Sequence, residues 1–298
     1  KRVLKRMEIV APEDITVLLS GETGTGKDLI AGTIHSLSHR KNGPFIAINC
    51  AAVPENLLES ELFGYEKGAF TGATSQKKGK FEIADGGTVF LNYVGEMAAP
   101  LQAKLLSFLE TSTFQRLGGL SDIHTDVRIL AATNIDMKEA IREGSFRQDL
   151  YYRIGRIQID IPPLRERKED IPELVRYFVS QIAKEFNRDI KKIDSTVMRK
   201  MANADWPGNI RQLRNTVEEM VIFADNGIIS SLPDATEPTD GLILPDRYDE
   251  LKELYHNLER RSIARALEIN SWNIKQTAES FGINRTRLHQ LIKQYNLR

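Results

Sequence analysis

The sequence is poor in cysteine, in long apolar stretches and in net charge. Its only cysteine is Cys50, which excludes an internal disulfide and is typical of a reducing cytoplasm. No apolar run approaches the roughly 20 residues of a membrane span, and no signal peptide is visible. Basic and acidic residues number 41 each, so any surface that attracts anions must be local. We therefore predict a cytoplasmic protein without a membrane partner.

The chain also lacks an initial methionine, because it begins at Lys1. We expect it to be part of a longer protein in which a preceding domain carries the regulation. Its 298 residues suffice for one large domain and one or two small ones.

A glycine-rich segment lies between the apolar run at 15–19 and a helical apolar pattern at 29–34. Its residues are Gly21, Glu22, Thr23, Gly24, Thr25, Gly26, Lys27 and Asp28. In a strand–loop–helix context, glycine backbone N–H groups close around a polyphosphate, the helix start adds a positive dipole, and Lys27 adds a charge. The segment therefore predicts a site for a nucleoside triphosphate.

The residue after the lysine departs from the usual motif, which has a serine or threonine there whose hydroxyl binds Mg²⁺. Asp28 stands there instead. A carboxylate holds Mg²⁺ through oxygen, directly or through water. We expect Mg²⁺ to accompany the nucleotide, with Asp28 as its protein ligand.

Apolar runs alternate with helical patterns through the first half of the chain. The candidate strands are 15–20, 45–49, 88–92, 128–132 and 157–161. The helical patterns between them are 28–38, 101–110 and 137–143. Such alternation predicts an α/β fold with a mostly parallel sheet covered by helices.

After Pro162 the strand patterns stop, and helical patterns follow at 171–186, 195–203 and 209–224. A stretch rich in proline, aspartate, threonine and glycine then reads as a linker. We divide the chain into an α/β P-loop core, a helical lid subdomain, the linker and a small all-α domain, at 1–164, 165–229, 230–248 and 249–298.

The C-terminal block is locally basic, because residues 258–298 carry eight lysines and arginines against three glutamates. Its apolar positions fit two short helices around a turn at 280–282, which is a helix-turn-helix pattern. Asn284 is predicted to cap the second helix. The residues expected to contact DNA are Lys275, Asn284, Arg285, Thr286, Arg287, His289 and Lys293. The alternative is a basic helical bundle that contacts protein.

The segment at 61–73 includes Gly68, Ala69, Phe70, Thr71, Gly72 and Ala73. It is similar to the GAFTGA loop of bacterial enhancer-binding proteins, the AAA+ ATPases that activate sigma-54-dependent transcription. Further segments at 49–52, 131–134, 146–153, 162–167 and 206–209 occur in the order of that family. The resemblance covers nearly the whole chain.

This resemblance implies an AAA+ core and lid followed by a Fis-like helix-turn-helix, with ATP as the nucleotide. It also implies enhancer DNA, sigma-54 RNA polymerase and copies of the same chain as partners, with assembly ranging from a dimer to a hexameric or heptameric ring. A place in a two-component system is expected from the same resemblance. In the family, the loop at 68–73 contacts sigma-54, and a neighbouring loop at 117–120 is expected to support it.

Several polar residues acquire roles by the same resemblance. The resemblance implies that one or both of Arg147 and Arg153 are arginine fingers, which stabilise charge on the γ-phosphate bound by a neighbouring subunit. Arg211 resembles the lid arginine that senses nucleotide in the same subunit, and Asn134 falls in a nucleotide-binding segment. The alternatives are surface ion-pair residues for the two fingers, a solvated helix-start arginine for Arg211, and an ordinary surface loop at 68–73.

One site breaks the family pattern. Asn92 and Tyr93 stand where the family has Asp-Glu, which hold the Mg²⁺ shell and polarise the attacking water. Asparagine carries no charge, and tyrosine is a poor base at neutral pH because its reference pKa is about 10. Loss of a general base costs about 10²–10⁴-fold in rate. Asn49, which partners that glutamate in the family, is expected to lose its partner.

Two functions remain open at this point. The first is an ATP-binding AAA+ activator of sigma-54 transcription whose hydrolysis is impaired by Asn92 and Tyr93. The second is a non-hydrolysing DNA-binding regulator that uses the AAA+ fold as an oligomerisation scaffold, or as a sensor of a nucleotide or signalling dinucleotide.

Overall fold

The computed structural model describes residues 2–52, 54–233, 260, 263–264, 266–267, 270, 272–280 and 284–295. The chain divides into two compact units, Lys1–Thr236 and Glu237–Arg298, and each is treated by itself. The predicted linker from 234 onward, and Phe281 and Gly282 of the predicted turn, lie outside the described residues. Within the described part, no helix is both long and apolar enough to cross a membrane.

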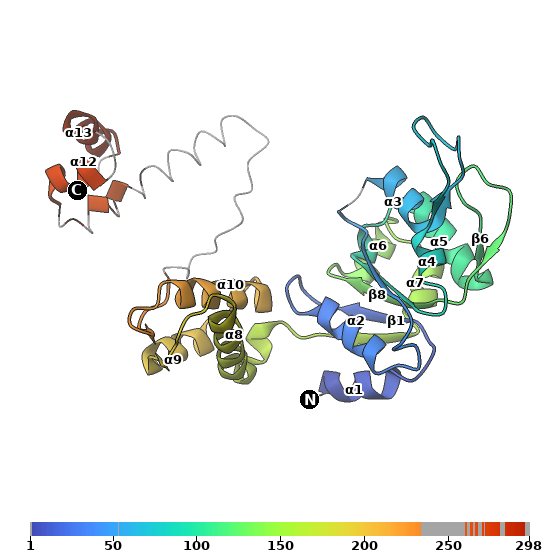
Figure 1. Cartoon of the computed structure of the whole chain (residues 1–298), viewed down its shortest axis with the longest axis horizontal. Coiled ribbons are helices and arrows are strands. Elements are labelled where there is room, and N and C mark those ends of the chain that lie inside the picture. Colours follow the sequence, from blue (N-terminus) through green and yellow to red (C-terminus); the bar gives the residue numbers. More distant parts are fainter. Residues whose placement is uncertain are drawn as a thin grey trace. The chain divides into compact units, whose positions relative to one another are not determined.

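A parallel five-stranded sheet, with β1 and β8 labelled in Figure 1, forms the core of the α/β part of the first unit. Its strand order is β2-β5-β8-β1-β9. The strands are β1 (Val17–Ser20), β2 (Phe45–Asn49), β5 (Thr88–Asn92), β8 (Arg128–Thr133) and β9 (Ile157–Asp160). Every residue of β5 and β8 is buried, as expected for inner strands covered on both faces. The predicted α/β fold class is confirmed.

Successive side chains of each strand point to opposite sides of the sheet. Apolar side chains therefore lie on both faces, and helices cover both. In β1, Leu18 joins one apolar layer with Leu105 and Phe108, whereas Val17 and Leu19 join the other. The covering helices are α1 (Arg2–Val10), α2 (Lys27–Ser36), α3 (Glu55–Phe63), α4 (Lys80–Ile83), α5 (Ala99–Thr111), α6 (Met137–Arg142) and α7 (Gln148–Ile154).

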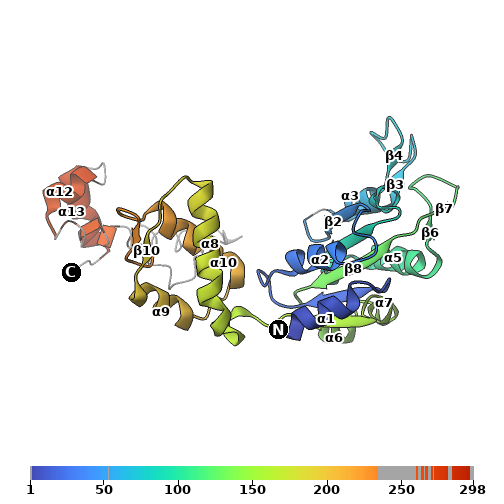
Figure 2. The ribbon, with the colours of Figure 1, turned by 60° about the horizontal axis from the view of Figure 1, so that its bottom comes forward.

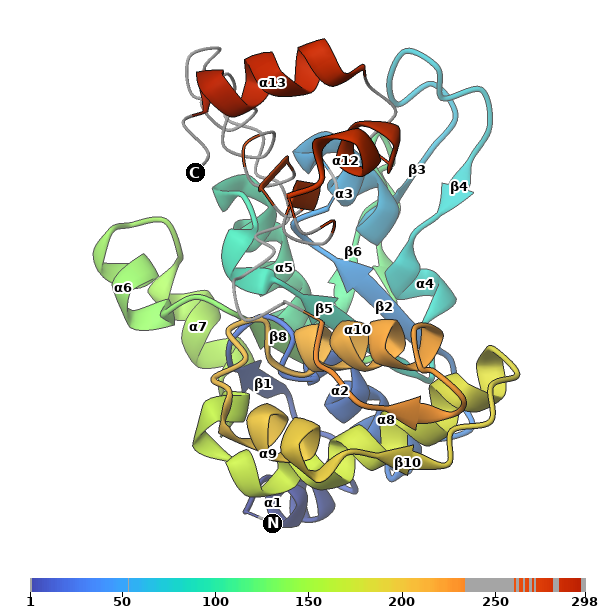
Figure 3. The same ribbon diagram turned by 90° about the vertical axis from the view of Figure 1, so that its left-hand side faces the viewer.

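Two short antiparallel pairs interrupt the α/β alternation (Figure 3). The first joins β3 (Gly64–Tyr65) to β4 (Lys77–Lys78), with residues 66–76 as its tip. The second joins β6 (Thr113–Phe114) to β7 (Ile123–His124). A 3-10 turn, η1 (Val94–Glu96), follows β5.

The helical part of the first unit contains α8 (Ile171–Glu185), α9 (Ser195–Asn203) and α10 (Asn209–Ile222), as Figure 2 shows. Two 3-10 turns precede them, η2 (Leu164–Glu166) and η3 (Lys168–Asp170), and β10 (Lys192–Ile193) pairs with β11 (Ile228–Ile229). The buried Trp206 donates its indole N–H to the Met201 carbonyl at 2.8 Å. We call this part the lid.

In the second unit, α12 (Ile274–Ser280) packs with α13 (Arg285–Gln294). Their apolar contacts involve Ile263, Leu267, Ala278, Leu288 and Leu291. Asn284 precedes α13, and its side-chain oxygen accepts the Arg287 backbone N–H at 2.8 Å. The predicted N-cap is confirmed.

Candidate functional site

The carboxyl ends of the parallel strands gather the polar residues of the site at one edge of the sheet. Asn49 at the end of β2 lies in register with Asn92 at the end of β5. Ser20 of β1 lies in register with Thr133 of β8, so the glycine-rich loop and Asn134 leave the same edge. Crevices at this edge are the usual ligand sites of open parallel sheets.

Lys27 begins α2 and folds back over the glycine-rich loop. It is 4% exposed, and its Nζ donates to the carbonyls of Gly21 at 2.7 Å and Glu22 at 2.9 Å. Burial lowers its pKa, and the charge of Arg211 adds to that effect while Asp28 opposes it. A phosphate held by the loop would stabilise this buried ammonium group.

The lid covers the other side of the loop. A Cβ atom added to Gly24 would lie 2.4 Å from the Gly208 carbonyl oxygen, and Gly24 has a φ of 81°, so both space and backbone require glycine. The Gly24 carbonyl accepts backbone N–H groups of Ile210 at 3.0 Å and Arg211 at 3.3 Å. The start of α10 is thus joined to the loop through the backbone.

Glu22 joins the loop to the lid through side chains. Its carboxylate accepts Arg165 at 2.6 and 2.8 Å, and Asn209 Nδ2 at 3.1 Å. Arg165 first, and then Asn209, lower the pKa of Glu22 to about 2. Asn209 is fully buried, and it also donates to the Thr23 carbonyl and accepts from the Leu164 N–H.

Sequence reasoning assigned no role to Arg165, Asn209 or Arg167. Arg167 donates to the Thr25 carbonyl at 3.1 Å, and its buried Nε has no hydrogen-bond partner. These residues lie in the segments 162–167 and 206–209, which resemble family segments. That resemblance was the one feature of the sequence that could have indicated them. Arg211 is exposed, and its backbone N–H donates to the loop at the Gly24 carbonyl, while its role in sensing nucleotide stays a prediction.

Asp28 and Asn92 contact each other directly. Asn92 Nδ2 donates to Asp28 Oδ1 at 2.8 Å, and Asn92 Oδ1 accepts the Tyr93 backbone N–H at 2.9 Å. The site therefore offers a cation one carboxylate, and the described residues contain no group of three acidic, histidine or cysteine ligands placed to hold a metal. One carboxylate with nucleotide phosphate oxygens is a donor set that fits Mg²⁺.

Tyr93 and Asn49 are engaged in local backbone structure. Tyr93 has left-handed dihedrals, φ 59° and ψ 39°, which are uncommon for a bulky residue and occur often at functional sites. The Asn49 side-chain oxygen accepts the backbone N–H groups of Ala51 at 3.0 Å and Ala52 at 3.2 Å. Among the described residues, no hydrogen bond joins Asn49 to Tyr93.

Asn134 follows β8 and lines a hollow of about 860 Å³ together with Gly21, Glu22 and Asp160. Its Oδ1 is buried and lacks a hydrogen-bond partner in the described part of the chain. A buried acceptor without a partner is costly, so a ligand that donates here would satisfy it.

The two candidate finger arginines have different surroundings. Arg147 is exposed and forms two bonds, at 2.7 and 3.0 Å, with the neighbouring Asp149. Arg153 is half-buried and donates to the Leu109 carbonyl at 2.6 and 3.2 Å, which fastens α7 to α5. In the described residues neither arginine has a hydrogen bond or ion pair to the glycine-rich loop.

The loop at 68–73 forms a compact tip above β3 and β4. Its Gly68 N–H donates to the Ala73 carbonyl at 2.9 Å. The Phe70 side chain is 46% exposed, and its ring forms a T-shaped contact with the Tyr65 ring, with the ring centroids 5.0 Å apart. Gly68 and Gly72 have φ values of 85° and 103°, which favour glycine. The loop therefore presents an aromatic side chain to solvent.

The neighbouring loop at 117–120 supports this tip. The Leu117 carbonyl accepts the Glu66 N–H at 3.0 Å, and a Cβ atom on Gly118 would lie 2.9 Å from the Ala69 Cβ. Arg116, which the sequence did not single out, binds Glu66 at 2.7 Å and Glu82 at 2.6 Å. The predicted support is confirmed, with Arg116 as its ionic centre.

In the second unit, the residues expected to contact DNA are exposed, whereas Leu288 and Leu291 of α13 are buried. Arg285, Thr286, Arg287 and His289 occupy the first half of α13, and Lys293 lies in its last turn. Lys275 lies in the first turn of α12.

Three family matches cover most of the chain. Residues 1–160 match "Sigma-54 interaction domain", residues 165–238 match "AAA+ ATPase lid domain", and residues 256–295 match "Bacterial regulatory protein, Fis family".

Curated relatives extend beyond the chain. The formate hydrogenlyase transcriptional activator FhlA of Escherichia coli (strain K12) is 43% identical over 302 residues, which cover 99% of this chain and 43% of FhlA. The regulatory protein AtoC of the same organism is 44% identical over 295 residues, covering 97% of this chain and 64% of AtoC. The chain thus spans about half the length of these relatives.

Solved structures agree with these matches. The crystal structure of NtrX from Brucella abortus is 34% identical, with a TM-score of 0.75, and covers 99% of this chain and 67% of NtrX. NtrX in complex with ATP has a TM-score of 0.73 at the same identity and coverage. Since the sigma-54 interaction domain alone matches more than half of its residues, the chain belongs to the family of sigma-54-dependent transcriptional activators.

Proposed function

We propose that the chain binds ATP at residues 21–28, assembles with its own copies, binds enhancer DNA through α13 and contacts sigma-54 RNA polymerase through the loop at 68–73. The observation that carries the nucleotide assignment is Lys27, buried over the glycine-rich loop, whose other side is covered by the lid at Gly24. NtrX, which is similar over nearly the whole chain, was solved in complex with ATP and with ADP.

Different residues of the site bind different parts of the nucleotide. Lys27 and the loop N–H groups hold the phosphates, Arg211 approaches from the lid, and Asn134 offers its unpaired acceptor. Asp28 would hold Mg²⁺, which neutralises phosphate charge when bound. Arg147, exposed on the surface, is available to a neighbouring subunit, whereas Arg153 stabilises α7.

We infer that hydrolysis is slow. Asn92 supplies no negative charge, its amide N–H is donated to Asp28, and its oxygen accepts the Tyr93 N–H. Tyr93 brings no carboxylate to take a proton from water, and Asn49 is occupied by two backbone N–H groups. Nucleotide binding and turnover are therefore separable in this chain.

The test compares ATP binding with phosphate release in the purified chain with Mg²⁺. We expect saturable binding of a fluorescent ATP analogue that Lys27→Ala abolishes, with phosphate release near background. Failure to bind ATP would contradict the site assignment. Rapid phosphate release would contradict only the impaired hydrolysis.

The Asn92–Asp28 contact also favours the second candidate, a non-hydrolysing regulator that uses nucleotide binding to assemble on DNA. That candidate predicts equal assembly and DNA binding with ATP and with a non-hydrolysable analogue, and no sigma-54-dependent transcription with either. A signalling dinucleotide that displaces the fluorescent ATP analogue would identify the sensor form. ATP-dependent transcription by the chain would contradict this candidate.

A further inference from the structure

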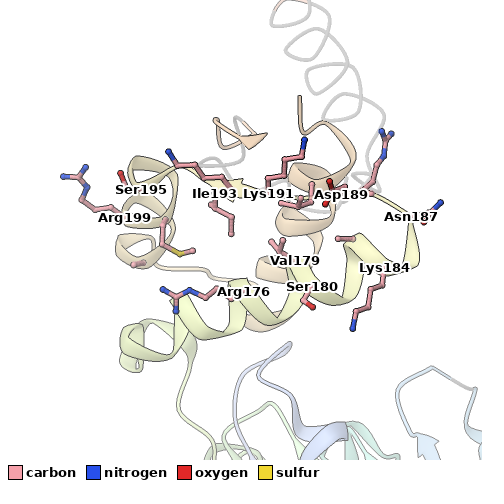
Figure 4. Close-up of a pocket in the computed structure, with 16 residues that line it drawn as sticks. Arg176, Val179, Ser180, Lys184, Asn187, Asp189, Lys191, Ile193, Ser195 and Arg199 are labelled. Carbon is pink, nitrogen blue, oxygen red and sulfur yellow. The ribbon is translucent and has the colours of Figure 1, made fainter. Parts of the chain in front are cut away.

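A groove in the lid lies between α8, α9 and the segment 187–193, and we call it the lid groove (Figure 4). Its volume is about 1050 Å³. None of its lining residues takes part in the contacts between the lid and the glycine-rich loop.

Apolar side chains form the floor of the lid groove. Val179 is buried in the lid core, and Ala183, Ile193 and Met198 are partly buried against it. Figure 4 shows Val179 and Ile193 directed toward the hollow from opposite sides. The floor can therefore receive an apolar side chain.

Basic side chains form the rim of the same groove. They are Arg176, Lys184, Arg188, Lys191, Lys192 and Arg199, and all are exposed. In Figure 4 the charged ends of Lys184, Lys191 and Arg199 point away from the hollow. Asp189 is the only acidic residue that lines the groove in the part of the chain that the structure describes.

This concentration of charge is unusual for the lid. Residues 165–229 contain twelve basic and eleven acidic residues, so half of the basic ones surround one groove. Within the described ranges, none of the six forms an ion pair, whereas Lys168, Arg165 and Arg214 of the lid do. Asp189 in the lining, and Asp194 beside Lys192 and Arg199, offset only part of this positive charge. The like charges that remain repel one another, and an anionic partner would reduce that repulsion.

We propose that the lid groove binds an acidic protein segment that carries a large apolar side chain. The apolar side chain enters between Val179 and Ile193, and carboxylates on either side of it meet the rim. Nucleic acid phosphates would use the rim alone and leave the apolar floor uncovered. The α8 wall from Arg176 to Lys184 is about 12 Å long, which about four extended residues span. This is recognition by an apolar anchor with complementary charge around it.

The test uses the full chain and a short fluorescein-labelled peptide in which aspartates and glutamates flank a Leu-Phe pair. A second peptide replaces that pair with serines. Arg199→Glu reverses a rim charge on α9, and Lys200→Glu is its matched control, because Lys200 is the next residue and does not line the groove. Both side chains are exposed, so both variants should fold.

We expect the Leu-Phe peptide to bind the unaltered chain, and Arg199→Glu to weaken that binding at least ~5-fold while Lys200→Glu changes it less than ~2-fold. The serine peptide should bind more weakly than the Leu-Phe peptide. No binding, or equal losses in both variants, would overturn the proposal. Equal binding of the two peptides would also overturn it. So would an Arg199→Glu variant that binds duplex DNA more weakly but binds the Leu-Phe peptide as the unaltered chain does.

Discussion

At the scale of single residues, Asn92 matters most for the chemistry of the nucleotide site. Its amide nitrogen lies 2.8 Å from the Asp28 carboxylate and donates a hydrogen bond to it, whereas an aspartate at position 92 would repel that carboxylate. Two carboxylates at that distance would raise one pKa unless a cation lay between them. The Asn92 amide can therefore bond directly to the Asp28 carboxylate without a cation between them.

Restoring the two family residues should restore turnover. We expect Asn92→Asp with Tyr93→Glu to raise phosphate release at least ~10-fold, a modest part of what a general base contributes. Asn92→Asp alone is the control, because it supplies charge without a base. If the double variant assembles normally and gains nothing, the limitation lies elsewhere in the chain.

Glu22 makes the joint between loop and lid sensitive to acid. Its pKa is lowered from 4.5 to about 2, mainly by Arg165, so its ionised form stabilises the folded state above pH 4.5. That stabilisation is lost as the pH falls from about 4.5 through 2. Solvent reaches 42% of each side chain, so the effect is screened.

We therefore expect Glu22→Gln to lower the urea midpoint of unfolding modestly at pH 6, and the difference from the unaltered chain to shrink as the pH approaches 3. Glu173→Gln serves as the control, since the exposed Glu173 has no ion pair among the described residues. A difference that stays constant with pH would show that the pair does not stabilise the folded chain.

At the scale of elements, the loop at 68–73 depends on a second loop for its position. Its glycines are free of close neighbours, since Cβ atoms at Gly68 or Gly72 would meet nothing within 4 Å. Its base, by contrast, is held by Arg116 and by the backbone of Leu117. The base of the loop is therefore more closely held by neighbouring residues than these two glycines are.

Arg116→Gln should release that base. We expect amide hydrogen exchange at 66–76 to increase at least ~5-fold, because bonds to charged groups are the stronger ones. Arg142→Gln, which removes an exposed pair with Glu139 on α6, should leave this exchange unchanged. Unchanged exchange in Arg116→Gln would show that the backbone contacts suffice.

The helix α13 should read DNA with its first half. A single helix-turn-helix covers one half-site, so two copies should bind a partly palindromic site with recognition helices about 34 Å apart. We expect Arg285→Ala to cost about 1–3 kcal/mol and to blur sequence preference. Lys293→Ala should weaken all sequences alike and reduce the salt dependence by about one unit of slope.

Salt titrations on specific and scrambled duplexes separate these two effects. If Arg285→Ala leaves the ratio of specific to scrambled affinity unchanged, the recognition helix has been assigned wrongly. Both side chains are exposed, and the buried Leu288 and Leu291 hold α13, so folding should be unaffected.

At the scale of the whole molecule, the two arginines of the segment 146–153 differ in what they stabilise. The exposed Arg147 guanidinium bonds only to its neighbour Asp149 among the described residues, as the proposed contact with another subunit requires. Arg153 is bound to the Leu109 carbonyl and belongs to the fold of its own chain. Arg147 is thus placed to contact another subunit, and Arg153 stabilises the packing of α7 on α5.

In the background Asn92→Asp, Tyr93→Glu, we expect Arg147→Ala to reduce phosphate release by ~10³-fold without changing the melting temperature. Arg153→Ala should lower the melting temperature by several degrees, because it removes two hydrogen bonds between α7 and α5. Mixing Arg147→Ala with Lys27→Ala subunits should restore partial turnover if Arg147 acts across subunits. No restoration would place its action within one chain.

The sequence by itself determined the features that depend on neighbouring residues. Alternating apolar runs predicted all five strands of the sheet, and Asn284 predicted the cap of α13, because periodicity and capping act within a few residues. The glycine-rich motif between a strand and a helix placed Lys27, and the family resemblance placed Arg147 and Phe70, although their roles remain predictions. The helices α1, α3, α4 and α7 were not predicted.

Only the tertiary structure decided which distant residues meet. Glu22 and Arg165 are 143 positions apart, Asn92 and Asp28 are 64 apart, and Arg116 and Glu66 are 50 apart. The strand order β2-β5-β8-β1-β9 and the packing of the lid bring such pairs together. No local pattern encodes these pairs, because a salt bridge or an amide contact depends on where two separate elements end in space.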